Sequence, residues 1–251
     1  MLELREVSVS FAGLQALRNV SLSARSGEVR ALIGPNGAGK TTLFNAITGY
    51  VPLSGGRIEL KGAPIHGLSP HQIAALGVRR TFQNGGLFPE LTALENVLAG
   101  LHSRIDASFA GILFGTRAAR AAERAALARA RELLQSLGVA HLADLPVKSL
   151  SGGQQRTIEI ARAVATEPPL LLLDEPAVGL APPLRLQLVE LIRRLAGEMG
   201  IAVLLIEHAV DLVMAAADAV AVFNGGIKIA EGTPAAIRSD PLVLEAYLGH
   251  G

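Results

Sequence analysis

Residues 29–42 read Val-Arg-Ala-Leu-Ile-Gly-Pro-Asn-Gly-Ala-Gly-Lys-Thr-Thr, and they carry the strongest structural signal in the sequence. Its first five residues form a short strand, and residues 40–47 have the spacing of a helix that stops at Gly49. Between the two, residues 34–41 fit the pattern G-x-x-x-x-G-K-[ST]. The order strand, glycine-rich loop, helix is the context that this pattern requires, and it predicts a loop that wraps a phosphate.

Each residue type in this loop has a chemical reason to be there. Glycines let the backbone approach a phosphate closely, and successive N–H groups with the helix N-terminus bind the anion. Lys40 can reach the β- and γ-phosphates of a nucleotide, and the Thr41 hydroxyl can ligate Mg²⁺. The alternative is a glycine-rich turn without a ligand.

A second motif reads Leu-Leu-Leu-Leu-Asp-Glu at residues 170–175. It predicts a buried strand that ends in two carboxylates. Asp174 is placed to hold Mg²⁺, directly or through water, and Glu175 to polarise an attacking water as general base. Many sheets end in acidic loops, so the motif gains its meaning from the phosphate loop that precedes it.

A third motif reads Leu-Ser-Gly-Gly-Gln-Gln-Arg at residues 150–156 and leads into a helical run at 157–165. A glycine-containing loop before a helix N-terminus is a second candidate anion site. Alternatively, Ser151 only caps the helix. The residues alone leave both interpretations open.

The remaining sequence predicts an α/β sheet with a helical block inserted. Residues 2–9 alternate as in a half-buried strand or hairpin, and residues 116–137 form a long helix that ends at Gly138. The arginines of this helix are interpreted as a solvated face, with contact to a membrane surface or permease as the alternative. Further strands are expected in the apolar runs, with helices between them: 170–173, 202–206 and 219–223.

Composition excludes several classes of protein. The 251 residues are 50% hydrophobic, yet no apolar run approaches the ~20 residues of a membrane-spanning helix. Lys and Arg number 23 against 22 Asp and Glu, which gives no support to a general nucleic-acid binder. Cysteine is absent, so disulfides and cysteine metal sites are excluded. No secretory signal is recognised at the N-terminus.

With its motifs in this order, the sequence resembles the nucleotide-binding subunits of ABC transporters. The resemblance covers nearly the whole chain and also includes Gln83, within Thr-Phe-Gln-Asn, and His208, within Ile-Glu-His. It implies an α/β fold: a phosphate-loop NTPase (RecA-like) core with an antiparallel β subdomain and an inserted α-helical subdomain. Residues 1–251 would form one domain, with the core and β subdomain at 1–84 and 156–251 and the helical subdomain at about 85–155.

The resemblance assigns roles to individual residues around ATP and Mg²⁺. Lys40, Gln83, Glu175 and His208 would be catalytic, and Thr41, Gln83 and Asp174 would serve the metal. Gln83 would also sense the attacking water, and His208 would contact the γ-phosphate. Phe11 would stack on adenine, and the alternative is an ordinary core phenylalanine. The expected nucleotide contacts are Phe11, Gly34, Pro35, Asn36, Gly37, Ala38, Gly39, Lys40, Thr41, Thr42, Ser151, Gly152, Gly153 and Gln154.

Partners follow from the same resemblance. Two chains, identical or homologous, would form a head-to-tail dimer in which residues 150–154 of one subunit cap the ATP of the other. The dimer would sit at the cytoplasmic face of the cell membrane, held by two transmembrane permease subunits. An extracytoplasmic substrate-binding protein would act indirectly, and no nucleic acid is expected.

Within the family, residues 11–17, 80–84, 87–92, 206–208 and 245–249 look like those of branched-chain amino-acid uptake ATPases. Residues 101–131 resemble the extra sequence of the longer of the two types in that system. The expected function is to hydrolyse ATP for an importer of branched-chain or related hydrophobic amino acids. The alternatives are urea or amide uptake, lipopolysaccharide export, a low-turnover regulatory subunit, or an ABC ATPase that acts on DNA or ribosomes.

One residue departs from the family pattern. After Leu180 these ATPases generally have Asp, and this branch often has Asn, whereas this chain has Ala181. Alanine offers no side-chain hydrogen bond in a loop that crosses the dimer. The departure predicts weaker coupling between the two ATP sites.

Overall fold

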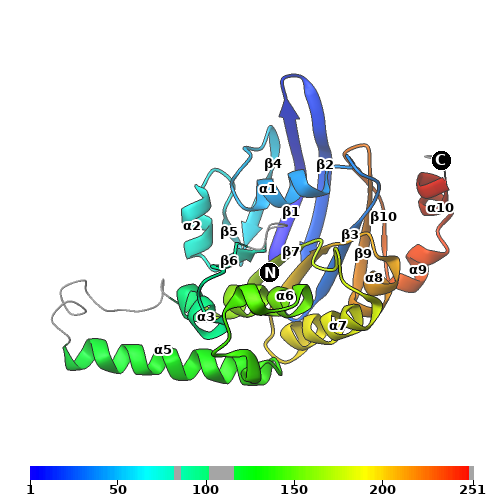
Figure 1. Cartoon of the computed structure of the whole chain (residues 1–251). Coiled ribbons are helices and arrows are strands. Elements are labelled where there is room, and N and C mark those ends of the chain that lie inside the picture. The colour runs from blue at the N-terminus through cyan, green and yellow to red at the C-terminus, as the bar shows by residue number, and fades with distance from the viewer. Residues whose placement is uncertain (82–85, 102–115, 249–251) are drawn as a thin grey trace. The chain divides into compact units, whose positions relative to one another are not determined.

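The computed structural model describes residues 1–81, 86–101 and 116–248, and the chain in it divides into two compact units (Figure 1). Unit 1 comprises Met1–Gln83 and Pro169–Gly251, and unit 2 comprises Asn84–Pro168. Helix α6 (Gly152–Val164) belongs to unit 2, where it packs on α3 (Ala93–Leu101). The boundary expected near residue 155 therefore falls inside unit 2.

A six-stranded sheet forms the centre of unit 1. Its strand order is β10-β9-β3-β8-β7-β6, and all neighbours are parallel except the β10–β9 pair. Every residue of β3, β8 and β7 is buried, and all but Arg30 and Asp174 are apolar, as is typical of strands that are covered on both faces. The strands are β3 (Val29–Ile33), β6 (Val78–Arg80), β7 (Leu170–Asp174), β8 (Ala202–Ile206), β9 (Ala219–Asn224) and β10 (Ile227–Gly232).

The four strands predicted from apolar runs are confirmed as β3, β7, β8 and β9. Strand register brings their ends together, since Leu32 of β3 and Asp174 of β7 both pair with Ile206 of β8. The loops that follow these three strands therefore leave the same edge of the sheet. In open parallel sheets this carboxyl edge is where ligands bind.

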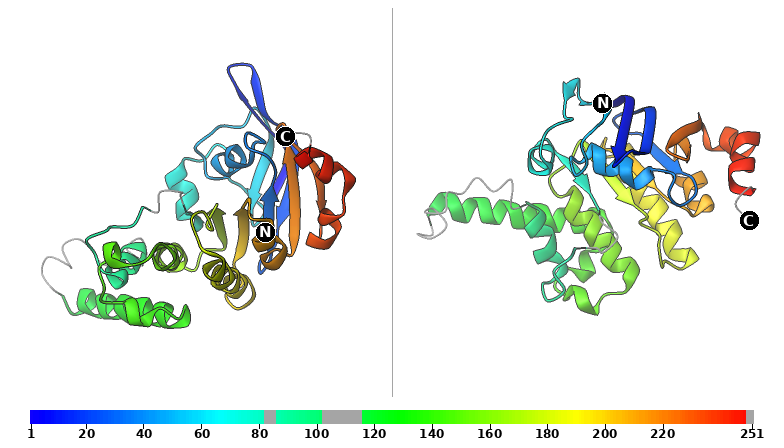
Figure 2. Two further views of the ribbon diagram at one scale, coloured as in Figure 1. Left: turned by 45° about the vertical axis from the view of Figure 1, so that its right-hand side comes forward. Right: turned by 90° about the horizontal axis from the view of Figure 1, so that it is seen from above.

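A second, antiparallel sheet has the strand order β2-β1-β4-β5. The strand or hairpin expected at residues 2–9 is a hairpin of β1 (Leu2–Phe11) and β2 (Leu14–Ala24), and its turn projects beyond the neighbouring strands of the sheet (Figure 2). The other strands are β4 (Gly55–Leu60) and β5 (Ala63–Pro64). Both sheets and helix α1 (Lys40–Ile47) contribute to one apolar core, which takes up much of the hydrophobic content: Leu4, Val9, Leu22, Leu43, Phe44, Ile58, Leu204 and Phe223.

The remaining helices of unit 1 lie between or after the strands. They are α2 (Pro70–Ala75), α7 (Pro182–Gly197), α8 (Val210–Ala216), α9 (Pro234–Arg238) and α10 (Pro241–Leu248). Helix α7 packs on β8 and β3. Among all described residues, no helix is both long and apolar enough to cross a membrane.

The described part of unit 2 is helical, and residues 102–115 lie outside it. The predicted long helix is confirmed as α5 (Arg117–Ser136), whose N-cap Thr116 accepts a hydrogen bond from the Ala119 N–H. Four of its arginines are exposed, as expected for a solvated face: Arg117, Arg120, Arg124 and Arg131. Two short 3-10 turns, η2 (Ala140–Leu142) and η3 (Val147–Ser149), connect α5 to α6.

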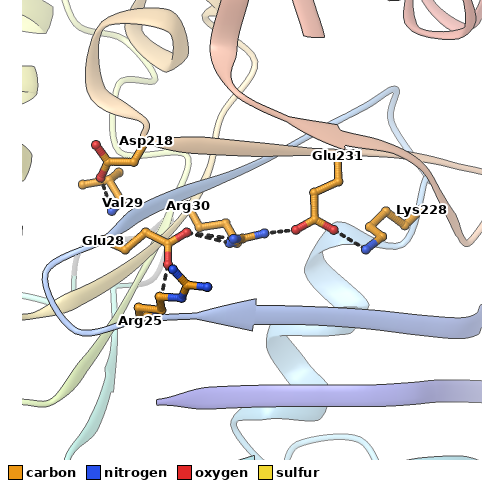
Figure 3. A network of polar contacts seen from close by, with 7 residues as sticks. All are labelled: Arg25, Glu28, Val29, Arg30, Asp218, Lys228 and Glu231. Carbon is orange, nitrogen blue, oxygen red and sulfur yellow. Dashed lines mark hydrogen bonds and ion pairs between the residues drawn. The ribbon is translucent and has the colours of Figure 1, made fainter. Parts of the chain in front are cut away.

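An ion-pair network joins β3 to β10 (Figure 3). Arg30 in β3, whose side chain is 10% exposed, pairs with Glu28 at 2.8 Å and with Glu231 in β10. Lys228 pairs with Glu231 and donates to the Ser21 carbonyl at 2.6 Å. Burial by itself raises the pKa of Glu231, but Lys228 and Arg30 outweigh that effect and lower it below the usual 4.5.

This network makes stability depend on pH. Because the folded-state pKa of Glu231 is lowered, its pairs stabilise the fold at neutral pH and lose that effect as pH falls through the folded value. We expect Glu231→Gln to lower the free energy of unfolding by about 1–2 kcal/mol at neutral pH. The difference from wild type should shrink at an acidic pH, as the lowered folded-state pKa of Glu231 is approached and this carboxyl becomes protonated in the wild-type protein.

Urea unfolding followed by circular dichroism at the two pH values measures the effect. Glu198→Gln is a matched control, because Glu198 forms an exposed helical ion pair with Arg194 at 3.6 Å. It should change stability by less than about 0.5 kcal/mol. If Glu231→Gln lowers the free energy of unfolding by the same amount at both pH values, the effect does not come from the charge of Glu231.

Candidate active site

The loop between β3 and α1 has the backbone of a phosphate-binding loop. Gly39 has φ 98°, and a Cβ added there would lie 2.8 Å from the Ala16 carbonyl oxygen, so only glycine fits. The tip of the loop, Asn36 and Gly37, is exposed. Helix α1 begins at Lys40, so the free N–H groups of its first turn face this loop.

Lys40 lies inside the loop. Its Nζ donates to the carbonyls of Gly34 at 2.7 Å and Pro35 at 2.9 Å, and the residue is 6% exposed. Burial lowers the pKa of Lys40 from its usual 10.5, while the charges of Glu175 and Asp174 act in the opposite direction. The two acidic residues of the second motif therefore lie close enough to act on the lysine of the first, as the sequence predicts.

Asp174 ends β7 and is 3% exposed. Its Oδ2 accepts a hydrogen bond from Arg80 Nη2 at 2.7 Å, whereas its buried Oδ1 has no hydrogen-bond partner in the described part of the chain. A buried carboxylate oxygen without a donor fits a hard divalent cation such as Mg²⁺, which prefers oxygen ligands. Thr41 follows Lys40 in α1 and is exposed, and Gln83 lies outside the described residues.

Glu175 and His208 meet across the edge of the sheet. Glu175 Oε1 lies 3.1 Å from His208 Nε2, although one residue follows β7 and the other lies two residues after β8. Glu175 has φ 48°, a left-handed conformation that costs free energy in a residue other than glycine. Its N–H donates to the Ile206 carbonyl at 2.9 Å, which holds this conformation. A carboxylate fixed in this way can orient and deprotonate a water molecule.

Glu207 is a site residue to which the sequence analysis assigned no role. It is 2% exposed and accepts three backbone hydrogen bonds, from Ala177 at 2.7 Å, His208 at 2.9 Å and Ala209 at 3.1 Å. These bonds join the loop after Glu175 to the loop that carries His208. The available signal was a carboxylate directly after a buried apolar strand, the same signal that identified Asp174.

The third motif begins α6 in unit 2. Ser151 is the N-cap: its Oγ accepts from the Gln154 N–H at 3.4 Å, and Gln154 Oε1 accepts from the Ser151 N–H at 2.9 Å. The capping interpretation is therefore confirmed. Gly152 is exposed and Gly153 partly so in the first helical turn, and the anion-binding role stays a prediction.

Phe11 lies at the end of β1, beside the hairpin turn, and is 46% exposed. The interpretation as an ordinary core phenylalanine is therefore wrong. An exposed ring can stack on a flat ligand, so the adenine contact stays a prediction that the exposure permits.

Ala181 is the N-cap of α7 and makes no side-chain capping bond. Aspartate there would accept a hydrogen bond from the helix and place a negative charge at its N-terminus. We expect Ala181→Asp to raise the free energy of unfolding by about 1 kcal/mol, measured by chemical denaturation of the isolated chain.

The same variant tests the hypothesis about coupling. In the assembled complex, Ala181→Asp should increase the cooperativity of ATP hydrolysis, whereas Ala181→Ser should raise stability with less effect on cooperativity. Unchanged ATPase rate and cooperativity in a stabilised Ala181→Asp protein would contradict weaker coupling through this loop.

Comparisons with known proteins agree with the geometry. The model of the family described as ABC transporter matches residues 17–178, and one described as branched-chain amino acid ATP-binding cassette transporter matches residues 228–251. The chain is 45% identical to the high-affinity branched-chain amino acid transport ATP-binding protein BraF of Pseudomonas aeruginosa, over 99% of this chain and 98% of the relative. It is 43% identical to the LivG protein of Escherichia coli K12, which has the same description, over the same shares.

Solved structures give the same result for the fold. The ADP conformation of an ATP-binding cassette from an ABC transporter superposes with a TM-score of 0.84 at 34% identity, over 100% of this chain and 99% of that one. A dimeric structure of a bacterial ABC transporter cassette has a TM-score of 0.77 at 26% identity, over 93% and 99%. The expected phosphate-loop NTPase fold is thereby confirmed.

Proposed function

The chain belongs to the ATP-binding proteins of ABC transporters, and from this membership we propose that it hydrolyses ATP to power the uptake of branched-chain amino acids. The observation that carries the proposal is the convergence of Lys40, Asp174, Glu175 and His208 at one edge of the sheet. The amino-acid substrate is supported by full-length relatives whose names specify branched-chain amino acid transport.

The reaction is ATP + water → ADP + phosphate, and the residues contribute by position and charge. The glycine-rich loop and Lys40 bind the phosphates, and Lys40 exchanges its bonds to loop carbonyls for phosphate oxygens. Mg²⁺, when held by Asp174 and Thr41, supplies positive charge to the phosphate oxygens. Glu175 orients the attacking water and takes its proton, and His208, bonded to Glu175, contacts the γ-phosphate.

A second copy or a homologous chain completes each site in the proposed assembly. Residues 151–154 would bind the ATP held by the other subunit, and the exposed first turn of α6 supports this role. A solved relative whose title describes a dimeric cassette supports such a pairing. ATP binding would close the dimer, and hydrolysis would reopen it.

Unit 2 offers an apolar surface for the membrane partners. Three of its large apolar side chains are exposed: Phe88 by 51%, Leu91 by 37% and Leu145 by 44%. Their segments lie side by side, because the Ala93 N–H donates to the Leu145 carbonyl and the Val147 N–H to the Leu91 carbonyl, both at 3.0 Å. Exposed apolar groups of this kind mark interaction sites.

This surface would therefore bind one permease subunit, and the two copies of it in a dimer would bind two. This arrangement would hold the protein at the cytoplasmic face of the cell membrane, with an extracytoplasmic binding protein delivering the amino acid. The alternatives of urea or amide uptake, lipopolysaccharide export, action on DNA or ribosomes, and regulation without turnover are not favoured by the relatives.

Phosphate release by the purified chain tests the enzymatic part of the proposal. Wild-type protein should release phosphate from ATP in the presence of Mg²⁺. Phosphate release should stop when EDTA removes the metal. Tight ATP binding without any turnover, alone and in the assembled transporter, would favour the regulatory alternative instead.

A further inference from the structure

Arg80 forms a buried ion pair that the proposed mechanism does not use. Its Nη2 donates to Asp174 Oδ2 at 2.7 Å, and the two side chains are 7% and 4% exposed. Its Nη1 donates to Asn45 Oδ1 at 2.7 Å, and the guanidinium lies 5.5 Å from the ring centre of Phe44. Asn45 and Phe44 belong to α1, so Arg80 connects β6 to both β7 and the helix after the phosphate loop.

The two oxygens of the Asp174 carboxylate have different surroundings. Arg80 occupies Oδ2, while Oδ1 is buried and has no hydrogen-bond partner among the residues described. A buried carboxylate needs a counter-charge, and arginine supplies one that cannot be deprotonated. Arg80 therefore neutralises Asp174 and leaves the second oxygen available.

The same positive charge must repel a divalent cation that approaches Oδ1. The site holds three carboxylates, Asp174, Glu175 and Glu207, against Lys40 and Arg80, so Arg80 lowers its net negative charge from two to one. Interactions between charges are strong where water is largely excluded. The phosphates of a nucleotide would add the negative charge that Arg80 offsets.

We propose that Arg80 is a fixed counter-ion of Asp174 that prevents Mg²⁺ from binding before the nucleotide is present. Arg80 is then a positioning residue, because it acts through Asp174. The proposal rests on the proposed use of Asp174 as the Mg²⁺ residue. It makes metal binding at this site depend on nucleotide binding.

Metal binding without nucleotide tests the proposal. Mn²⁺ replaces Mg²⁺ as the probe, and loss of the free-ion signal in electron paramagnetic resonance reports its binding to the full chain. Arg80→Gln removes the charge and keeps groups that can hydrogen-bond Asp174 and Asn45. We expect it to bind Mn²⁺ at least about tenfold more tightly than wild type, and Arg80→Lys, which keeps the positive charge, to bind Mn²⁺ less tightly than Arg80→Gln.

Arg79→Gln is the matched control. Arg79 is the neighbouring residue of β6, and because successive strand residues point to opposite faces, its side chain points away from that of Arg80. Its guanidinium donates to the Ala74 carbonyl of α2 at 2.5 Å. Arg79→Gln removes the same charge and should leave Mn²⁺ binding unchanged. Adding Asp174→Asn to Arg80→Gln should abolish the gained binding.

Three results would overturn the proposal. Arg80→Gln could bind Mn²⁺ no more tightly than wild type, Arg79→Gln could gain as much Mn²⁺ affinity as Arg80→Gln, or the gained affinity could remain when Asp174→Asn is added. If Arg80→Gln does not fold, Mn²⁺ binding to the wild-type protein is the test. Binding of Mn²⁺ to wild type without nucleotide, if Asp174→Asn abolishes it, would also contradict the proposal. Failure of ATP to recruit Mn²⁺ to wild type would instead overturn the proposed function.

Discussion

Glu175→Gln should lower the rate of ATP hydrolysis by about 10²–10³-fold while ATP still binds. Glutamine has nearly the same shape, so it can keep the hydrogen bond to His208, and the backbone bond from residue 175 to the Ile206 carbonyl does not involve the side chain. What is lost is the carboxylate that takes the proton of water. ATP should therefore accumulate unhydrolysed, and the closed dimer should persist.

Two measurements check this result. Phosphate release gives the rate, and gel filtration with Mg²⁺ and ATP should show a dimer of Glu175→Gln that wild type forms only transiently. Glu190→Gln, an exposed residue of α7, controls for the loss of one carboxylate. Hydrolysis by Glu175→Gln at the wild-type rate would remove Glu175 from the role of general base.

Lys40→Ala should abolish hydrolysis, with a fall of more than about 100-fold, and should also weaken ATP binding at least about tenfold. The two defects occur together because Lys40 bonds the phosphates before and during the reaction. Its present acceptors, the Gly34 and Pro35 carbonyls, belong to the loop itself, so the fold should survive the substitution. Glu175→Gln, by contrast, should lose turnover alone.

Binding of a fluorescent ATP analogue and phosphate release together separate these defects. Lys61→Ala is the control, since Lys61 is exposed in the turn between β4 and β5. Lys40→Arg should not rescue activity, because a guanidinium is larger and differently shaped than an ammonium. Normal ATP affinity in a folded Lys40→Ala protein would contradict the assigned phosphate loop.

The parts of the site that were predicted from sequence are those whose chemistry lies within a few consecutive residues. The phosphate loop and the Asp174-Glu175 pair each combine a recognisable strand with polar residues at its end. The structure adds partners from distant segments. Arg80 and Asp174 are 94 positions apart in sequence, and no local pattern indicates that they pair.

The same limit applies to the fold. Strand β6 has three residues and β10 lies at the edge of the sheet, so neither forms the apolar run that identified β3, β7, β8 and β9. Ser151 shows a different limit, because a helix cap and an anion site need the same residue types. The structure shows the cap, and a bound nucleotide in a dimer is needed to test the second role.

Uptake by a reconstituted transporter tests the central claim most directly. The chain would be assembled with its permeases and a second ATPase subunit in proteoliposomes that contain ATP and Mg²⁺, with the binding protein and radioactive leucine outside. We predict leucine accumulation that requires ATP and is lost with Glu175→Gln. ATP hydrolysis without leucine uptake, or uptake that Glu175→Gln leaves unchanged, would contradict the claim.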